Sequence, residues 1–208
     1  IGYIRREGNQ HAKAGNLNHA FSVTSAEFVL QLDADHVPLP NILDRMLGYF
    51  NEPRLAFVQS PQDFSNTDSF THVINDEGGQ MWEENRLFFS LIQPGKDRWN
   101  AAFFCGSCGI LRRSAFDEIG GFSTRTITED METSMMLHAR GWKSFYPGET
   151  LAYGLATASA AQYPVQRRRW GQVSMQMLSK MNPMFVKGLA CQLTPSIFCP
   201  VLLYVFGF

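Results

Sequence analysis

The sequence lacks a strong charge of either sign, which argues against a nucleic-acid-binding protein. Its formal net charge is −1 over 208 residues, whereas a nucleic-acid surface usually shows a clear basic excess. The chain also has no internal repeat and no low-complexity tract. At this length it can bury one core, and a second full domain is not expected. Aromatic residues are plentiful, with 17 Phe and 4 Trp, which suits a deep core with carbohydrate or membrane contacts.

Cysteine is scarce as well. Of the four cysteines, Cys105 and Cys108 have the C-x-x-C spacing that is typical of zinc and redox sites. Structural zinc requires four ligands, and Cys191 and Cys199 lie far away in an apolar stretch. We therefore expect reduced thiols in a cytosolic environment rather than a zinc site or a disulfide.

Charge is absent from the last segment, Thr194 to Phe208. A membrane-spanning helix needs about 20 apolar residues, and this shorter stretch contains Pro195 and Pro200. It could be a truncated span, a re-entrant segment or a buried helix. The chain begins at Ile1, inside a strand-like stretch with no start methionine or signal-peptide pattern. We therefore expect an internal piece of a larger membrane protein, truncated at both ends.

Strands and helices are predicted to alternate in the first part of the chain. The patterns indicate a helix over 14–26, a strand over 28–32, a helix from Pro40 to about Phe50 and a strand over 55–58. The second helix would bury a stripe made of Leu43, Met46, Leu47 and Phe50. Such alternation is typical of an α/β domain with a mostly parallel sheet.

The rest of the chain is less regular. Residues 60–100 are rich in polar residues and are expected to wrap the active-site face, with a helix over 80–91 and a turn at Pro94-Gly95. Further expected elements are a strand over 109–111, a helix over 114–119, a helix from 128 to about 138, strands over 143–146 and 151–153, and a helix over 164–181.

Asp33, Asp35 and His36 follow the first predicted strand. Ligands in open α/β sheets bind beyond the carboxyl ends of the strands. Carboxylates suit Mg²⁺ or Mn²⁺, which usually complete their coordination with substrate phosphates, and imidazole suits Mn²⁺-like cations. Asp residues are also common in solvated loops after strands, so the pair by itself leaves both interpretations open.

Glu129 and Asp130 begin a predicted helix that Thr128 would cap. A carboxylate at this place can act as a general base towards an acceptor hydroxyl. Acidic residues in the first turn are also favoured by the helix dipole alone, so this residue pair does not prove catalysis.

Gln166, Arg169 and Trp170 have the spacing i, i+3, i+4 and would share one helix face, whereas Arg167 and Arg168 would point elsewhere. An arginine can bind a diphosphate through paired hydrogen bonds, and a tryptophan offers a flat surface to a sugar. The alternative is an amphipathic helix with Trp in the core and arginines facing water or lipid headgroups. Lys13, beside the first helix, is a further candidate for phosphate or base binding.

Taken together, five segments resemble those of processive glycosyltransferases of family 2, with the greatest likeness to bacterial cellulose synthase catalytic subunits. In chain order they are 13–18 (KAGNLN), 33–36 (DADH), 103–107 (FFCGS), 128–130 (TED) and 166–170 (QRRRW). The resemblance runs from Tyr3 into the apolar tail. Ser107 stands where Thr is most often seen, and it keeps the hydroxyl group.

The resemblance implies an inverting enzyme that adds glucose from UDP-glucose to the non-reducing end of a growing β-1,4-glucan. Asp130 would be the catalytic base. Donor contacts would come from Lys13 near the uracil, Asp33 and Arg169, and Asp35 and His36 would hold Mg²⁺ or Mn²⁺. The implied acceptor contacts are Gln166, Trp170, Phe103, Phe104, Cys105 and Glu129.

The resemblance also implies a domain organisation. A GT-A α/β domain without its first strands would occupy 1–160, an interfacial amphipathic helix 161–187, and the start of a membrane region 188–208. The full-length protein would lie in the inner (plasma) membrane with a cytoplasmic catalytic domain, contact lipid and an accessory secretion subunit, and bind no nucleic acid. The 208-residue piece alone is expected to be inactive.

Two other functions remain open. A related synthase could use another nucleotide sugar to make chitin, hyaluronan or mannan, or act on a lipid-linked acceptor. An inactive carbohydrate-binding scaffold is a further alternative, although it would be expected to lack Asp33, Asp35 or Asp130, and all three are present.

Overall fold

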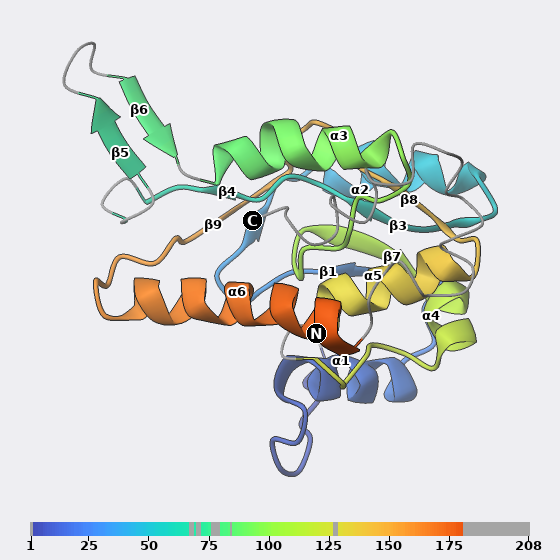
Figure 1. Cartoon of the computed structure of the whole chain (residues 1–208). Helices are drawn as coiled ribbons and strands as arrows, with labels where there is room; N and C mark the ends of the chain where they lie inside the picture. Colours follow the sequence, from blue (N-terminus) through green and yellow to red (C-terminus); the bar gives the residue numbers. More distant parts are fainter. Residues whose placement is uncertain are drawn as a thin grey trace.

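A four-stranded sheet in the order β1-β7-β3-β8 forms the centre of the fold (Figure 1). The computed structural model describes residues 2–66, 69, 72–75, 80–83, 85–126 and 129–180. Thr128, Cys191, Cys199 and the apolar tail from Thr194 lie outside these residues, as do the membrane region expected over 188–208 and the end of the helix expected to reach 181.

The central sheet is mixed. β7 (Gly109–Arg112) lies between β1 (Phe28–Gln31) and β3 (Leu55–Gln59) and runs antiparallel to both, while β8 (Lys143–Phe145) pairs in parallel with β3. The expectation of a mostly parallel sheet is therefore wrong for the pairings, although β1, β3 and β8 point the same way. An apolar run predicts a buried strand but carries no information about its direction.

Two smaller groups of strands lie beside the central sheet. β9 (Ala152–Gly154) pairs with β2 (Val37–Pro38) and with β4 (Asp63–Phe64). β5 (His72–Asn75) and β6 (Gln80–Glu83) form an antiparallel pair that projects from the body of the molecule (Figure 1). The helix expected from residue 80 is therefore wrong at its start, because the helical region begins only at Arg86.

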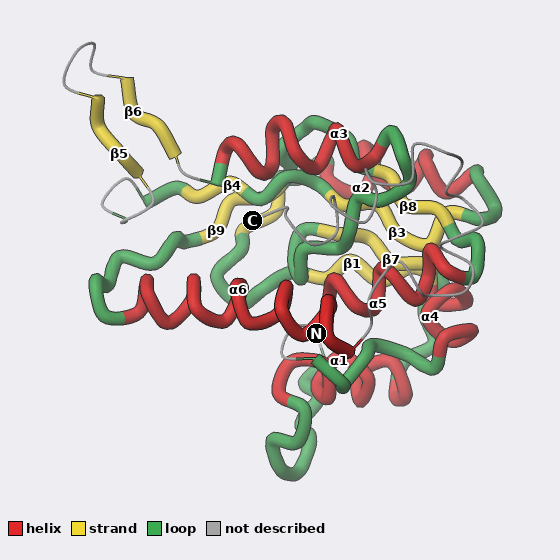
Figure 2. The backbone as a smooth tube through the Cα atoms, viewed as in Figure 1, coloured by secondary structure: helices red, strands yellow, loops and turns green. Residues whose placement is uncertain are grey.

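Helices cover both faces of the central sheet, as Figure 2 shows. On one face α1 (Ala12–Val23), α4 (Arg113–Ile119) and α5 (Glu129–Ala139) share a core cluster with β3 and β7. On the other face α2 (Ile42–Met46) and the 3₁₀ helix η1 (Leu47–Asn51) pack against the same strands. Burial of this apolar surface is the main stabilising contribution to such a fold.

The buried stripe of the second helix differs from the prediction. Met46 and Phe50 are buried, but Leu43 and Leu47 are exposed, and Ile42 takes their place in the core. The buried residues Ile42, Met46 and Phe50 are spaced i, i+4, i+8 across α2 and the 3₁₀ helix that follows it from Leu47.

A π-helical turn, η2 (Phe88–Ile92), leads directly into α3 (Gln93–Asp97). Pro94 and Gly95 lie inside this helix, so the turn expected there is wrong. Pro94 follows the π-helical turn directly, at a place where the regular α-helical hydrogen-bond pattern is already interrupted. The flanking residues Gln93 and Lys96 are fully buried, and this tertiary burial outweighs the local turn signal.

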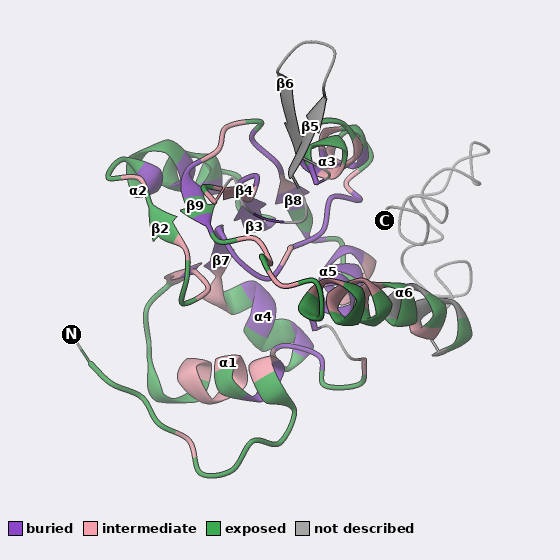
Figure 3. Ribbon diagram, turned by 90° about the vertical axis from the view of Figure 1, so that its left-hand side faces the viewer, coloured by how far each residue is buried: buried purple, intermediate pink, exposed green. Residues whose placement is uncertain are grey.

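The last described helix, α6 (Gln162–Lys180), is exposed along much of its length (Figure 3). Val165 and Met175 are more than half exposed on it. Over the described residues, no helix combines the length and the apolar character that crossing a membrane requires.

Lys96 is a buried cation within α3. Its side chain is fully buried, and its Nζ has no hydrogen-bond acceptor among the described residues. The Nζ atom lies 4.5 Å from the ring centroid of Phe103 and 5.5 Å from that of Phe88. Burial lowers the pKa of Lys96 to about 8. The native state therefore carries a desolvation cost at neutral pH that the two rings offset only in part, because cation–π contacts contribute about 0.5–2 kcal/mol each.

Replacing Lys96 by Met is expected to raise the free energy of unfolding at pH 7 by about 1–3 kcal/mol, since a pKa unit corresponds to about 1.4 kcal/mol. The unfolded chain keeps Lys96 protonated up to its ordinary pKa of 10.5. The stability of the wild type should therefore rise between about pH 8 and 10.5, and the difference from Lys96→Met should shrink over that range.

Denaturant unfolding followed by tryptophan fluorescence at several pH values measures this difference. The control is Lys143→Met, because Lys143 is half exposed and pairs with Glu52 at 2.9 Å. A Lys96→Met variant that is no more stable than this control would contradict the assignment of a desolvated ammonium.

Candidate active site

Three segments that are distant in sequence meet at one edge of the central sheet. Gly109 pairs with Gln31 on one side and with Gln59 on the other. Because β7 is antiparallel to both neighbours, residues just before β7 lie beside residues just after β1 and β3. The edge therefore brings the segment 103–108 next to Asp33.

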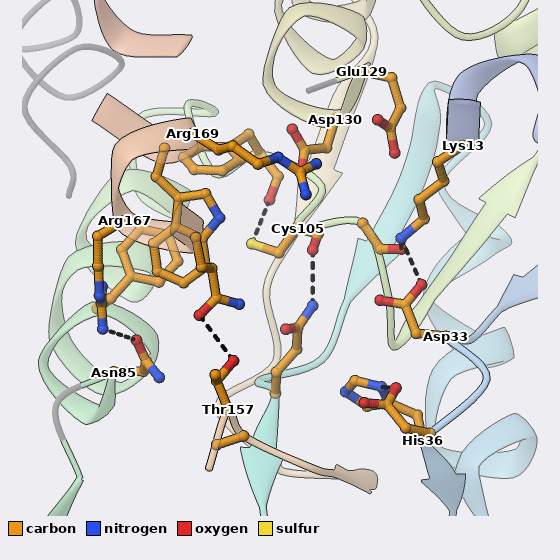
Figure 4. Close-up of a pocket in the computed structure, with 18 of the residues that line it drawn as sticks. Lys13, Asp33, His36, Asn85, Cys105, Glu129, Asp130, Thr157, Arg167 and Arg169 are labelled. Atoms are coloured by element: carbon orange, nitrogen blue, oxygen red, sulfur yellow. Dashed lines mark hydrogen bonds and ion pairs between the residues drawn. The ribbon is translucent and has the colours of Figure 1, made fainter. Parts of the chain in front are cut away.

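A cavity of about 870 Å³ opens at this edge (Figure 4). The predicted site residues that line it come from α1, the loop after β1, the segment before β7, α5 and α6. They are Lys13, Asp33, Asp35, His36, Phe103, Cys105, Glu129, Asp130, Gln166, Arg169 and Trp170.

Phe104 does not line the cavity. It is 1% exposed and belongs to the core cluster between the sheet and α1, α4 and α5. Its ring would lie 2.7 Å from a Cβ atom at Gly109, so the glycine at the start of β7 makes room for it. Successive residues of an extended segment point to opposite sides, and here Phe103 takes the cavity side. The acceptor contact predicted for Phe104 is therefore not supported by the structure.

Lys13 connects the first helix to this edge. Its Nζ donates to Asp33 Oδ1 at 2.5 Å and to the carbonyl of Gly106 at 2.7 Å. Gly106 has φ +81°, and a Cβ atom there would lie 3.2 Å from Lys13 Nζ and 3.4 Å from Asp130 Oδ2. Glycine thus lets the backbone pass between the Lys13 ammonium group and the Asp130 carboxylate.

Asp35 and His36 are adjacent donor groups. His36 Nδ1 lies 3.1 Å from Asp35 Oδ1, and the imidazole is almost completely buried, whereas the carboxylate is 44% exposed. His36 Nε2 is buried without a hydrogen-bond partner among the described residues. The ring packs against β9, where a Cβ atom at Gly154 would come within 2.7 Å of it.

These groups fit a hard divalent cation that takes only part of its coordination from the protein. Among the described residues no three His, Cys, Asp or Glu side chains converge into a complete cage. Mg²⁺ and Mn²⁺ sites with one or two carboxylates plus substrate phosphates are common.

Glu129 and Asp130 occupy the first turn of α5. Burial, followed by the neighbouring Asp130 charge, raises the pKa of Glu129. Asp130 Oδ1 accepts a hydrogen bond from the Met131 N–H at 2.7 Å. One turn later, Ser134 Oγ accepts from the Phe104 N–H at 2.9 Å, which fixes α5 to the cavity wall.

Cys105 is held by three glutamines. Gln59 Oε1 accepts from the Cys105 N–H at 2.9 Å, Gln62 Nε2 donates to the Cys105 carbonyl at 2.8 Å, and Gln93 Nε2 lies 2.9 Å from Sγ. Burial raises the pKa of the Cys105 thiol, and it raises that of Cys108 to about 11. Cys105 and Cys108 are both free thiols.

α6 contributes a further wall of the cavity. Thr157 Oγ1 and Gln166 Oε1 are 3.4 Å apart, and Arg169 points into the cavity towards Asp130 (Figure 4). Arg167 also lines the cavity, so the expectation that it points elsewhere is wrong. Its partner there is Asn85, which belongs to the segment before η2. The helical spacing of α6 does not reveal this partner.

Several residues of the site are not predictable from sequence patterns. Gln62, Asn85 and Thr157 line the cavity but belong to no recognisable pattern. Gln59 and Gln93, fully buried behind the wall, were also missed. Gln59 is the one of these residues that the sequence could have indicated. It ends an apolar strand, and an amide buried there needs hydrogen-bond partners.

Known proteins with similar sequences include cellulose synthases. The chain is 43% identical over 190 residues to a UDP-forming cellulose synthase catalytic subunit from Pseudomonas fluorescens, covering 91% of this chain and 26% of that protein. It is 45% identical over 190 residues to a putative cellulose synthase 2 from Komagataeibacter xylinus, covering 90% of this chain and 12% of that protein. The chain thus spans about a quarter or less of the length of these curated relatives.

A solved structure shares the fold. The mannosyltransferase PcManGT from Pyrobaculum calidifontis, in complex with GDP-Man and Mn²⁺, superposes with a TM-score of 0.61 at 19% sequence identity, covering 96% of this chain and 48% of that one. The α/β GT-A-like architecture is therefore confirmed. The model of the glycosyl transferase family 2 matches residues 1–120, more than half of the sequence. The chain is a member of glycosyl transferase family 2.

Proposed function

We propose that this chain carries the catalytic centre of a processive, inverting transferase that adds glucose from UDP-glucose to the non-reducing end of a β-1,4-glucan. The observation that carries the proposal is the cavity itself, which brings a carboxylate, a lysine–aspartate pair and the α6 arginine into one space. The 40–45% identity to cellulose synthases over about nine-tenths of the chain supports glucose as the transferred sugar.

The donor would lie along the edge of the sheet. Lys13 and Asp33, joined by an ion pair, would contact the nucleotide. Arg169 would bind the diphosphate and stabilise the negative charge that develops on it as the sugar leaves. An arginine suits this role because its planar guanidinium forms two parallel hydrogen bonds with a phosphate group.

Asp35 and His36 would hold a divalent cation, Mg²⁺ or Mn²⁺, beside the diphosphate. The cation would supply electrostatic stabilisation of the leaving group. The buried His36 ring is oriented by Asp35 on one side and by the close packing of Gly154 on the other.

The acceptor would approach from the opposite side. Asp130 would take the proton of the acceptor hydroxyl as it attacks the anomeric carbon from the face away from UDP, which inverts the configuration. Trp170 and Gln166 would hold the terminal sugar, while Phe103, Cys105 and Glu129 would line its path. Burial, followed by the neighbouring Asp130 charge, raises the pKa of Glu129.

The larger context is also proposed. We infer that the full-length protein lies in the membrane, contacts lipid through the region from α6 onward and passes the glucan to an accessory secretion subunit. α6 is suited to a membrane interface because Val165 and Met175 are exposed on it beside arginines. The domain limits of 1–160, 161–187 and 188–208 remain predictions, as does the inactivity of the isolated piece.

Asp130→Asn in the full-length protein should lower glucan synthesis by about 10²–10⁴-fold, because the acceptor hydroxyl would lose its base. Incorporation of radiolabelled sugar by membrane vesicles, with UDP-glucose and Mg²⁺, measures this. Glu129→Gln is the matched variant, since it neutralises the adjacent carboxyl group and should lose far less activity.

The chemical nature of the labelled polymer shows which sugar nucleotide the enzyme uses. Cellulase should degrade the labelled wild-type polymer, and UDP-N-acetylglucosamine or GDP-mannose should not replace UDP-glucose. A cellulase-resistant product would instead indicate a sister synthase. Full activity in Asp130→Asn would rule out Asp130 as the base.

Gly154→Ala is expected to weaken the cation-dependent part of UDP binding, because the new Cβ would lie 2.7 Å from the His36 ring. Titration calorimetry of the full-length protein with UDP, in Mg²⁺ and in EDTA, separates the two contributions. Gly148→Ala is the control, as nothing lies within 4 Å of a Cβ atom there. Equal loss of affinity in Mg²⁺ and in EDTA would show that His36 does not act through the cation.

A further inference from the structure

We infer that Arg167 is a positioning residue that fixes the indole of Trp170 and thereby sets how firmly the acceptor end is held. The inference rests on the proposed function, in which Trp170 contacts the acceptor. The guanidinium carbon of Arg167 lies 4.6 Å from the Trp170 ring centroid and 5.1 Å from the Tyr163 ring centroid. These three residues are spaced i−4, i, i+3 on α6 and so form one ladder on its surface.

The ladder of Tyr163, Arg167 and Trp170 is hydrogen-bonded to Asn85, which lines the cavity from outside α6. Arg167 donates from a terminal guanidinium nitrogen to Asn85 Oδ1 at 3.3 Å, and the two side chains face each other in Figure 4. Asn85 is 8% exposed and directly precedes the helical region that begins at Arg86. Because Asn85 is buried, its side chain has little freedom to move. The Arg167–Asn85 hydrogen bond therefore limits how Arg167, and with it Trp170, can move.

A guanidinium can serve both contacts at once because its plane stacks on an aromatic ring while its edge donates hydrogen bonds. A lysine carries the same charge but cannot stack in this way. The neutral Gln keeps an amide donor but loses the cation–π attraction to the indole. Charge alone is therefore not what this position requires.

Arg168 provides a matched comparison. It has the same side chain on the same helix, yet it is exposed and is absent from the cavity lining. Substitutions at 167 and 168 alter net charge and helix propensity equally, so a difference between them isolates the contacts with Trp170 and Asn85.

The test uses the full-length protein in membrane vesicles and compares Arg167→Gln, Arg167→Lys, Asn85→Ala and Arg168→Gln. A loosened acceptor end dissociates sooner, so both Arg167 variants should shorten the mean glucan chain by about three- to thirtyfold. The KM for UDP-glucose should stay within about twofold of wild type. Asn85→Ala should shorten the chain less, and Arg168→Gln should leave its length unchanged.

Product lengths in Arg167→Gln that equal those of Arg168→Gln would overturn the inference. So would a rise in the KM for UDP-glucose that matches the loss of length, since that would indicate a general disturbance of the site. If the wild type makes no glucan, the proposed function fails, and a second readout still decides the role of Arg167.

That readout is hydroxyl-radical footprinting of Trp170 by mass spectrometry in the same full-length proteins without substrate. Removing the guanidinium uncovers the indole, so Trp170 should oxidise faster in Arg167→Gln than in Arg168→Gln. Equal oxidation rates would show that Arg167 does not hold the ring, whatever polymer the enzyme makes.

Discussion

Residues 103–107 belong to no helix or strand, yet Phe103, Cys105 and Gly106 line the cavity, and the backbone of the segment is held by side-chain amides. Gln59 is the last residue of β3, Gln62 lies just after it, and Gln93 comes from α3. Together they donate to the carbonyl groups of Phe103, Cys105 and Ser107. A buried polar group without a partner costs about 1–3 kcal/mol, so an irregular segment can be buried only where such partners exist. The position of every group on this wall depends on these hydrogen bonds.

The mixed direction of the central sheet explains why segments from the whole chain meet at one cavity. If β7 ran parallel to its neighbours, the residues before it would emerge at the opposite edge, far from Asp33. Its antiparallel insertion instead places Gly106 beside Lys13, and Ser107 Oγ accepts a hydrogen bond from the Asp33 N–H at 2.9 Å. α5 then adds Asp130 from one side of this edge and α6 adds Arg169 from another.

Much of this arrangement was predictable, and the misses have physical causes. The strand at 55–58 and the helix beginning at Glu129 have strong local signals, an unbroken apolar run and an acidic first turn. The strand at 80–83 and the direction of β7 depend on pairing with distant residues, which local patterns do not encode. In the site, charged residues next to apolar elements, such as Asp33, were identified from sequence. Arg167 was misplaced because its partners, Asn85 and the Trp170 ring, are set by tertiary packing.

The balance of charge in the cavity bears on how the proposed donor would arrive. Four carboxylic side chains line it, Asp33, Asp35, Glu129 and Asp130, against three lysine or arginine side chains, Lys13, Arg167 and Arg169. An anionic sugar nucleotide therefore gains little long-range attraction from this surface, and added salt has little attraction to screen. Encounter with a bare nucleotide should depend only weakly on ionic strength. A nucleotide that arrives with its charge partly neutralised by a bound cation would meet less repulsion from the four acids, so the proposed ion would act in the encounter as well as in the chemistry.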